Sequence, residues 1–241
     1  MRGVILAGGK GTRLLPVTQV VNKHMVPILN RPMITYPLGT LKSLGISDIL
    51  VVSGGDHIGG IAEFLGDGSG FGVSFTYRVQ RDAGGIAQAL GLARDFANGQ
   101  AIAVILGDNI FDNQVVSKKA RGLDPTNAHI FTKIVKDPQR FGVVTPGGLI
   151  VEKPKKPKSN QAVTGLYMYP PEVFGIIPAL NPSARGELEI TDVNNYFIQN
   201  KKCVVHSLGN AFWSDAGTPQ SLFEVTAWAF KSRKTNLYAE T

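Results

Sequence analysis

The sequence predicts an α/β fold with a central mixed, mostly parallel sheet flanked by helices. In the first half of its 241 residues, short apolar runs rich in β-branched residues alternate with glycine-rich or polar segments and with stretches of helical spacing. Such alternation is typical of parallel βαβ units. In the second half the apolar runs are shorter, which indicates an antiparallel or mixed extension that covers one side of the first half. The hydrophobic content of 43% is enough for a substantial core, and we expect a single domain over residues 1–241.

The first half contains the predicted βαβ units. Strands are expected at 4–7, 49–53, 73–78 and 101–106, and helices at 34–44, 57–65 and 84–96. Pro37 and Gly39 fit poorly inside the helix 34–44, because an interior proline removes a backbone hydrogen bond. This helix therefore either begins later or is kinked.

The second half contains shorter predicted elements. Strands are expected at 130–135, 143–145, 149–152, 163–169 and 204–208, and helices at 190–200 and 219–231. No long helix separates the first three of these strands. The chain has neither a repeat of fixed period nor a low-complexity linker, which again favours one domain.

Composition limits where the protein works and what it binds. The chain has no run near 18 apolar residues, and the apolar run at its start is too short for a signal peptide, so we expect no membrane association and a cytoplasmic location. Cys203 is the only cysteine, which excludes an internal disulfide and fits a reducing compartment; we expect it to be a buried small hydrophobe. The four histidines show no ligand-like spacing, so a zinc site is not expected.

The net charge of +7 favours anionic partners, which include nucleic acid, acidic membranes and phosphorylated metabolites. The densest basic run, residues 153–158, is interrupted by two prolines and has no aromatic residues for stacking on bases. Nucleic-acid binding is therefore the minor alternative.

A glycine-rich loop follows the first predicted strand, at the edge where α/β sheets bind ligands. Gly8, Gly9 and Gly11 allow close approach of a phosphate to backbone N–H groups, and Arg13 and Lys23 add positive charge. A dinucleotide fingerprint would need a glycine in place of Leu14, and a Walker loop would open a helix that Pro16 interrupts. The loop is thus predicted to bind a polyphosphate, against the alternative of a flexible surface turn.

Together with motifs further along the chain, this loop resembles the sugar-1-phosphate nucleotidyltransferase family, and within it most closely the glucose-1-phosphate thymidylyltransferases. The matching motifs run in family order over nearly the whole chain. They are Leu6-Ala7-Gly8-Gly9-Lys10-Gly11-Thr12-Arg13-Leu14, Pro16, Thr18, Asn22-Lys23, Pro27, Gln80, Gly84-Gly85-Ile86-Ala87-Gln88-Ala89, Gly107-Asp108-Asn109, Phe141-Gly142-Val143, Glu152-Lys153-Pro154, Val163-Thr164-Gly165-Leu166-Tyr167, Arg185-Gly186-Glu187-Leu188-Glu189-Ile190-Thr191-Asp192 and Trp213-Ser214-Asp215-Ala216-Gly217-Thr218.

The resemblance implies a Rossmann-like nucleotidyltransferase fold of the GT-A-like type, with a nucleotide-binding half over 1–110 and a sugar-phosphate-binding half over 111–241. It also implies the substrates dTTP and glucose-1-phosphate, a Mg²⁺ cofactor, and in-line attack on the α-phosphorus with release of pyrophosphate. Because a phosphate monoester is largely dianionic at neutral pH, this reaction needs no general base.

Catalytic and metal-binding roles follow from the matched positions. Asp108 and Asp215 match the aspartates that hold the magnesium ion, and two carboxylates give the oxygen ligation that Mg²⁺ prefers. Arg13 and Lys23 match residues that contact the phosphates, with Lys23 between both substrates. Lys153 completes the implied catalytic set of Arg13, Lys23, Asp108 and Lys153.

The resemblance also assigns the two substrate sites. The implied nucleotide contacts are Leu6, Gly8, Gly9, Gly11, Thr12, Arg13, Gln80 and Gly85, of which Gln80 and Gly85 recognise the base. The implied sugar-phosphate contacts are Lys23, Asn109, Gly142, Glu152, Lys153, Val163 and Arg185. Asp82-Ala83-Gly84 departs from the family pattern, which has a proline and an acidic residue there. Thymine differs from uracil by one methyl group, worth about 1–3 kcal/mol, so UTP is an alternative substrate.

Other interpretations stay open. Longer family members have a C-terminal helical extension that builds subunit contacts and a regulatory nucleotide site, and this chain ends at Thr241. We therefore expect a homodimer, without regulation through that site. Alternatives to a thymidylyltransferase are an enzyme for UTP or another hexose-1-phosphate, a non-catalytic nucleotide-sugar-binding protein, and a nucleic-acid-binding module.

Overall fold

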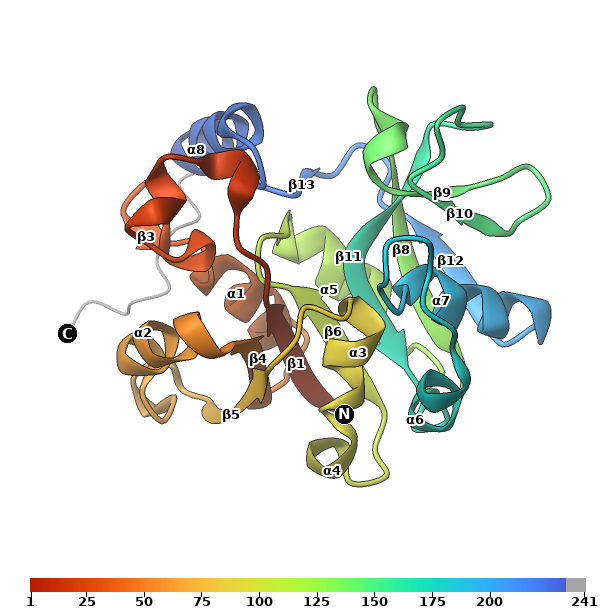
Figure 1. The fold of residues 1–241 in the computed structure, drawn as a ribbon, viewed down its shortest axis with the longest axis horizontal. Coiled ribbons are helices and arrows are strands. Elements are labelled where there is room, and N and C mark those ends of the chain that lie inside the picture. Colours follow the sequence, from red (N-terminus) through yellow and green to blue (C-terminus); the bar gives the residue numbers. More distant parts are fainter. Residues whose placement is uncertain (233–241) are drawn as a thin grey trace.

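The chain folds around a nine-stranded mixed sheet with the strand order β10-β9-β11-β6-β1-β4-β5, to which β8 and β12 add beside β11. The computed structural model describes residues 1–232. Four neighbouring strands are parallel to one another (Figure 1). They are β1 (Arg2–Ala7), β4 (Asp48–Gly54), β5 (Ser74–Gln80) and β6 (Ile102–Leu106).

The remaining strands extend this sheet beyond β6. β11 (Gln161–Tyr169) runs antiparallel to β6 and also to β8 (Ala128–Ile134), and β12 (Cys203–Ser207) runs parallel to β8. β9 (Gly142–Val144) and β10 (Ile150–Glu152) form a hairpin at the far edge. The expected antiparallel extension is confirmed, but it lengthens the sheet instead of covering one side of the first half, because β11 pairs directly with β6.

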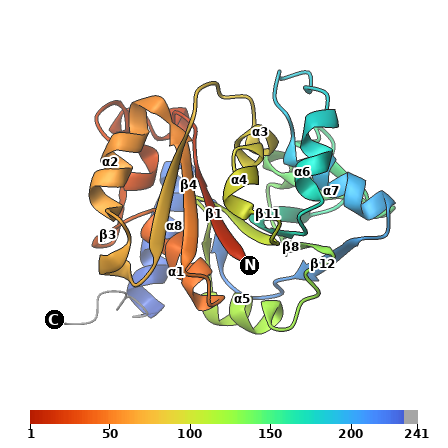
Figure 2. The same cartoon turned by 90° about the horizontal axis from the view of Figure 1, so that it is seen from below.

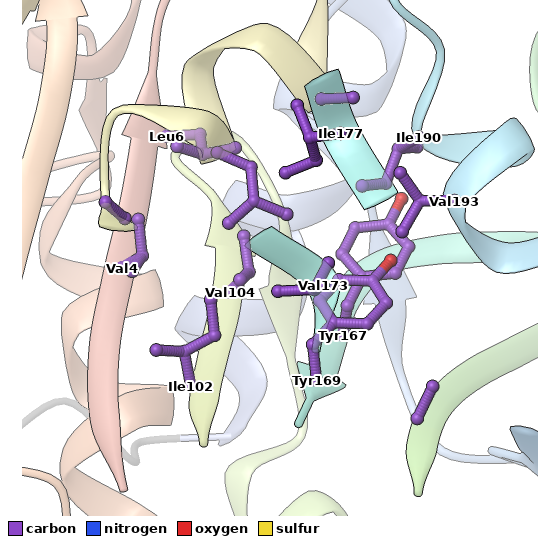
Figure 3. Close-up of a cluster of buried hydrophobic side chains, with 14 of the residues drawn as sticks. Val4, Leu6, Ile102, Val104, Tyr167, Tyr169, Val173, Ile177, Ile190 and Val193 are labelled. Carbon is purple, nitrogen blue, oxygen red and sulfur yellow. The ribbon is translucent and has the colours of Figure 1, made fainter. Parts of the chain in front are cut away.

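Helices cover both faces of the sheet (Figure 2). Their bounds are α1 (Thr35–Ser43), α2 (Gly55–Leu65), α3 (Ile86–Gly91), α4 (Arg94–Ala97), α5 (Asn113–Ala120), α6 (Val173–Ile176), α7 (Ile190–Gln199) and α8 (Pro219–Ser232). Alternate residues of β1 point to opposite faces, so Val4 and Leu6 pack with α3, α6 and α7 (Figure 3), while Ile5 and Ala7 pack with α1 and α2. This burial on both faces explains why the strand is apolar throughout.

A third, smaller core connects the two ends of the described chain. Val26, Ile28 and Met33 of the N-terminal loop pack with Val225 and Ala229 of α8. In Figure 1, α8 accordingly lies beside the segment that contains β3 (Arg31–Pro32), which pairs with β2 (Pro27–Ile28). Two further short strands, β7 (Ile110–Phe111) and β13 (Trp213–Ser214), pair with each other and lead from the sheet to α8.

Most predicted elements are confirmed within a few residues. The helix expected at 34–44 begins at Thr35, so Pro37 lies in its first turn, where no backbone N–H is needed for an intrahelical bond. The single helix expected at 84–96 is wrong: Gly84 and Gly85 stay outside it, and it breaks after Gly91 into α3 and α4. Gly85 has φ +100°, which a helix does not allow.

Two expectations about single residues need qualification. Cys203 is only half-buried, and this burial raises the pKa of its thiol to about 11. His129 and His206, which are far apart in sequence, lie with Nδ1 and Nε2 3.1 Å apart because β8 and β12 are neighbours. Among residues 1–232, no helix combines the length and apolarity needed to cross a bilayer. The division into halves at residue 110 remains a prediction.

Candidate active site

Two cavities meet at the carboxyl ends of the parallel strands. The first, of about 250 Å³, lies between the glycine loop, Gln80 and the start of α3. The second, of about 510 Å³, lies between β6, β11, the β9–β10 hairpin and β13. Ile86, Leu106 and Asp108 line both cavities. A ligand in each cavity would therefore meet the other beside Asp108.

The glycine loop forms one wall of the first cavity. Gly9 and Gly11 have φ of +94° and +64°, a region that favours glycine. A Cβ at Gly11 would lie 2.9 Å from the Thr18 side chain, whose hydroxyl donates to the Gly11 carbonyl at 2.8 Å. The loop is thus folded back on the segment that leads to Lys23. Its backbone at Gly8 and Gly9 faces the cavity.

Lys23 and Asp108 form a mostly buried ion pair between the two cavities. Lys23 Nζ lies 2.6 Å from Asp108 Oδ2, and each side chain is exposed by little more than a tenth. The other Asp108 oxygen accepts from Asn109 Nδ2 at 2.9 Å. Burial alone would raise the pKa of Asp108, but Lys23, His24 and these hydrogen bonds lower it below its ordinary value. Asp108 is therefore a carboxylate at neutral pH.

Asn109 fixes this end of β6 against β11 and β13. Its Oδ1 accepts from the Gly165 backbone N–H at 2.9 Å and from Trp213 Nε1 at 2.8 Å. A Cβ at Gly165 would lie 2.6 Å from Asn109 Oδ1. Glycine at this position thus makes room for the Asn109 amide.

Asp215 lies in the second cavity opposite Asp108 and beside two guanidinium groups. Its Oδ2 is 2.5 Å from Arg140 Nη2 and 3.9 Å from Arg13 Nη1. Burial and the negative charge of Asp108 raise the pKa of Asp215, while Arg140 and Arg13 oppose that rise. The two aspartates are thus close enough to repel each other, an arrangement that a bound cation would relieve.

His24 lies under the glycine loop and stays uncharged. It is 1% exposed, and its backbone N–H and Nδ1 both lie within hydrogen-bond distance of Asn22 Oδ1. Burial, helped by the charge of Lys23, lowers the pKa of His24 to about 3. Lys23 is therefore the positive charge at this wall of the first cavity.

Glu152 and its partners form one edge of the second cavity. Thr191 donates to Glu152 Oε2 at 2.5 Å, and Lys153 and Arg185 lie 3.7 and 3.6 Å from Oε1. Arg185 also makes a bidentate contact with Glu189, in which Nε donates to Oε1 at 3.2 Å and Nη2 donates to Oε2 at 2.8 Å. Glu152 is therefore held in place at the edge of the cavity by a hydroxyl and two cations.

Asn194 is a buried amide on the same cavity wall. It is 1% exposed, and its Oδ1 accepts from the Tyr169 hydroxyl at 2.6 Å. Its Nδ2 has no hydrogen-bond partner within residues 1–232. A buried unpaired donor costs about 1–3 kcal/mol, and a polar ligand in the cavity would offset that cost.

The structure brings most of the predicted site residues together. Leu6, Gly8, Gly9, Lys23, Gln80, Gly85 and Asp108 line the first cavity. Arg13, Asn109, Gly142, Glu152, Lys153, Val163 and Asp215 line the second together with Asp108. Gly11, Thr12 and Arg185 line neither cavity, although Arg185 contacts Glu152.

Sequence reasoning missed several residues of the site. His24, Arg140 and Asn194 received no role, and Gln88 and Thr191 appeared only inside motifs. Arg140 directly precedes the Phe141-Gly142-Val143 motif, and that position was the available signal. Asn194 gives no signal in the sequence, because only the packing of α7 on β11 shows where it points.

The residues present fit a hard divalent cation. Asp108 and Asp215 line one cavity, and carboxylate oxygens are the ligands that a hard cation such as Mg²⁺ prefers. Within residues 1–232 there is no cluster of three or more such ligands, so the remaining ligands would come from substrate and solvent.

Comparisons with known proteins agree with this geometry. The model of the family described as nucleotidyl transferase matches residues 2–231. A glucose-1-phosphate thymidylyltransferase of Neisseria meningitidis is 42% identical over 236 residues, which are 95% of this chain and 82% of the relative. The enzyme of that name from Xanthomonas campestris is 42% identical over 231 residues, covering 92% and 78%.

Solved structures are similar as well. A Bacillus anthracis protein named as a candidate glucose-1-phosphate thymidylyltransferase, solved with sucrose, superposes with a TM-score of 0.89 at 46% identity and covers 100% of this chain and 98% of its own. A UDP-glucose pyrophosphorylase solved with UDP-glucose has a TM-score of 0.81 at 22% identity, covering 96% and 99%. The latter similarity shows the fold alone.

Proposed function

This chain belongs to the nucleotidyl transferase family, and from that premise we propose that it is a glucose-1-phosphate thymidylyltransferase that forms dTDP-glucose and pyrophosphate from dTTP and glucose-1-phosphate. The observation that supports this most strongly is the meeting of two cavities at Asp108. One cavity has a glycine loop and an amide suited to a base, and the other has carboxylates and cations suited to a sugar phosphate.

In this proposal the first cavity binds the nucleotide. The backbone of Gly8 and Gly9 approaches the phosphates, and Gln80 and Gly85 face the base. Arg13, more than half of whose side chain is exposed, is free to contact the leaving pyrophosphate. UTP is the alternative nucleotide, since a single methyl group separates it from dTTP at the base.

The second cavity then binds the sugar phosphate. Glu152 accepts from sugar hydroxyls, and the backbone at Gly142 and Val163 lines the wall beside it. Lys153 and Arg185 stand next to Glu152, where they can contact the sugar's phosphate. Asn194 donates from its otherwise unpaired Nδ2 to a sugar oxygen.

The chain's own contribution to the reaction is charge neutralisation and positioning. The sugar phosphate attacks as a dianion, so no side chain has to remove a proton. Lys23, held between the cavities by Asp108, offsets the repulsion between the two polyanions. Arg13 stabilises the negative charge that develops on the leaving pyrophosphate.

Asp108 and Asp215 are the residues that would hold Mg²⁺, which supplies further neutralisation of the phosphates when bound. Lys23 and Arg140 occupy one oxygen of each carboxylate, and both side chains are long enough to move aside. A cytoplasmic location and a homodimer remain predictions from the sequence.

The test is pyrophosphate release measured across dTTP, UTP, dCTP, ATP and GTP with several hexose-1-phosphates, each with Mg²⁺ and with EDTA. We expect the highest kcat/KM for dTTP with glucose-1-phosphate and loss of turnover in EDTA. Binding of dTTP without turnover on any sugar phosphate would instead favour a non-catalytic nucleotide-sugar-binding protein. A salt-steep affinity for DNA with none for dTTP would favour a nucleic-acid-binding module.

A further inference from the structure

Gln88 on α3 contacts the base-recognising residue Gln80 from outside the cavity. Gln80 Nε2 donates to Gln88 Oε1 at 2.8 Å and to the Gly85 carbonyl at 3.2 Å. Gln88 Oε1 also accepts from the Gly84 backbone N–H at 3.1 Å. Gln88 does not line either cavity, so its role is not ligand contact.

These contacts fix which way both amides point. The Gly84 N–H can only donate, so the Gln88 atom that faces it must be the oxygen. The Gly85 carbonyl can only accept, so the Gln80 atom that faces it must be the nitrogen. Two backbone groups that cannot be turned over therefore determine the orientation of both side chains.

The consequence is that Gln80 presents only an acceptor to the cavity. The two hydrogen bonds that Nε2 donates both go to protein groups. The Oε1 atom lies 3.2 Å from the position that a Cβ on Gly8 would occupy. A base bound against Gly8 must therefore bring an N–H to Gln80. Thymine and uracil have that N–H at ring position 3, whereas cytosine has a lone pair there and carries its N–H donors on the exocyclic N4, so the acceptor discriminates where ring position 3 faces Gln80.

Gly84 makes this arrangement possible. A Cβ on Gly84 would overlap the Gln88 amide nitrogen and would lie 2.5 Å from its Cδ. The backbone of Gly84 is outside the left-handed region, so alanine is compatible with its conformation. Residue 84 must therefore lack a side chain because of where the Gln88 amide lies, and not because of its own backbone conformation.

We propose that Gln88, seated on Gly84, is a positioning residue that locks Gln80 with its oxygen toward the base and thereby selects N3–H pyrimidines over cytosine. The inference rests on the proposed function, because it assumes that the first cavity binds the nucleotide base. It adds a residue and a backbone position to the base-recognition site, and it predicts the substrate class from the direction of one amide.

The experiment compares kcat/KM for dTTP and dCTP, and Kd for the same nucleotides by calorimetry. In the wild type we expect a strong preference for dTTP in both ratios. Gln88→Met keeps the length of the side chain but lacks the amide oxygen, so only the longer Gly85 contact at 3.2 Å still orients the Gln80 nitrogen, and both ratios should fall by about tenfold or more. Gly84→Ala should give the same result by displacing the Gln88 amide.

Gln88→Glu is the matched control, because a carboxylate still accepts from Gly84 and Gln80. It should keep the dTTP preference even if overall affinity changes. A merely structural role for Gln88 does not explain such a difference between Gln88→Glu and Gln88→Met. A wild type without preference, or Gln88→Met with an unchanged ratio, overturns the inference. If no triphosphate supports pyrophosphate release, the proposed function fails, and the Kd ratios then decide the inference by themselves.

Discussion

At the scale of single residues, the candidate site consists of charged groups that hold one another. Lys23 holds Asp108, Arg140 holds Asp215, and Arg185 contacts Glu152 as well as Glu189. Each carboxylate is therefore oriented by a neighbouring cation. Removal of one member is expected to leave its partner buried and unpaired, which is costly.

Asp108→Ala should abolish pyrophosphate release from dTTP and glucose-1-phosphate, by at least on the order of a thousandfold in kcat/KM. The reason is that it removes a proposed metal ligand and leaves Lys23 without its partner. Circular dichroism should show an intact fold, since Asp108 lies at the end of β6. Asp108→Asn is the matched variant, and near-normal activity in either variant would exclude Asp108 from the mechanism.

Arg140→Met should shift the acid limb of the activity profile to higher pH. Arg140 opposes the rise in the pKa of Asp215 that burial and Asp108 cause, so without Arg140 Asp215 takes up a proton at a higher pH. Activity at neutral pH should fall about tenfold or more, because a buried hydrogen-bonded ion pair is broken. A pH profile of kcat/KM checks this, with Arg140→Lys as the charge-conserving control. A parallel loss at every pH would contradict it.

Gly85→Ala should reduce kcat/KM for dTTP by at least about tenfold. Gly85 has φ +100°, and a Cβ there would lie 2.5 Å from the Leu188 carbonyl oxygen, so the loop must move away from residues 183–188. Steady-state kinetics with dTTP measures the effect. Gly99→Ala is a matched control, since Gly99 also has positive φ but lies in open space; equal losses in both variants would point to backbone strain alone.

The site residues that could be predicted are those in contiguous motifs. The glycine loop with Lys23, the Asp108 turn and Glu152-Lys153 line the two cavities as a sequence comparison implies. Gln88 and Asn194 could not be assigned, because their roles depend on the direction of an amide and on a neighbour from another element. Side-chain direction is a product of tertiary packing and leaves no periodic pattern.

At the scale of elements, β11 joins β6, which leads to Asp108, to the strands of the second half. It pairs with β6 and β8, and its register with β8 shifts between Val163 and Tyr167. Within that irregular stretch the Gly165 N–H leaves the ladder and donates to Asn109. A β-bulge of this kind next to a site redirects the backbone toward the functional residues.

Gly165→Ala should therefore impair the site without unfolding the sheet. The new methyl group would overlap the Asn109 amide, which also accepts from Trp213 and donates to Asp108. We expect a decrease in kcat of about tenfold or more and altered Trp213 fluorescence, with a loss of stability of about 1–3 kcal/mol. Gly175→Ala, which meets open space, is the control; unchanged fluorescence and kcat in Gly165→Ala would contradict the role of Asn109.

Elements with a strong hydrophobic period were predictable, and those fixed by tertiary contact were not. β1 and β6 are apolar on both faces, so their sequences predict buried strands. α5 was missed because Val116 is its only buried residue, so the segment has no apolar stripe. β7 and β13 were missed because two-residue strands exist only through their pairing with each other.

At the scale of the whole molecule, the protein should lose stability as the pH falls below about 6.5. His24 is buried and neutral with a pKa lowered to about 3, so below its ordinary pKa the unfolded chain takes up a proton that the folded chain does not. The contribution is fully present above pH 6.5 and is lost progressively between about 6.5 and 3. At pH 5 the free energy of unfolding should be about 2 kcal/mol lower through this group.

Urea unfolding at pH 7.5 and pH 5, in EDTA, measures this difference. His24→Gln should show a smaller difference between the two pH values, and parallel curves for both proteins would exclude His24 as the source.

His206 adds in the same direction, since burial and His129 lower its pKa. His129 Nε2–H donates to the Asp124 carbonyl at 2.8 Å, so its Nδ1 accepts from His206 Nε2–H.

The order in which the chain is made has a consequence for the N-terminal loop. Val26, Ile28 and Met33 leave the ribosome well before Val225 and Ala229, the residues of α8 that pack against them. During translation the loop that begins at Gly8 must therefore wait, partly uncovered, until α8 has emerged. Nascent chains stalled before α8 should therefore leave Val26, Ile28 and Met33 open to chaperones.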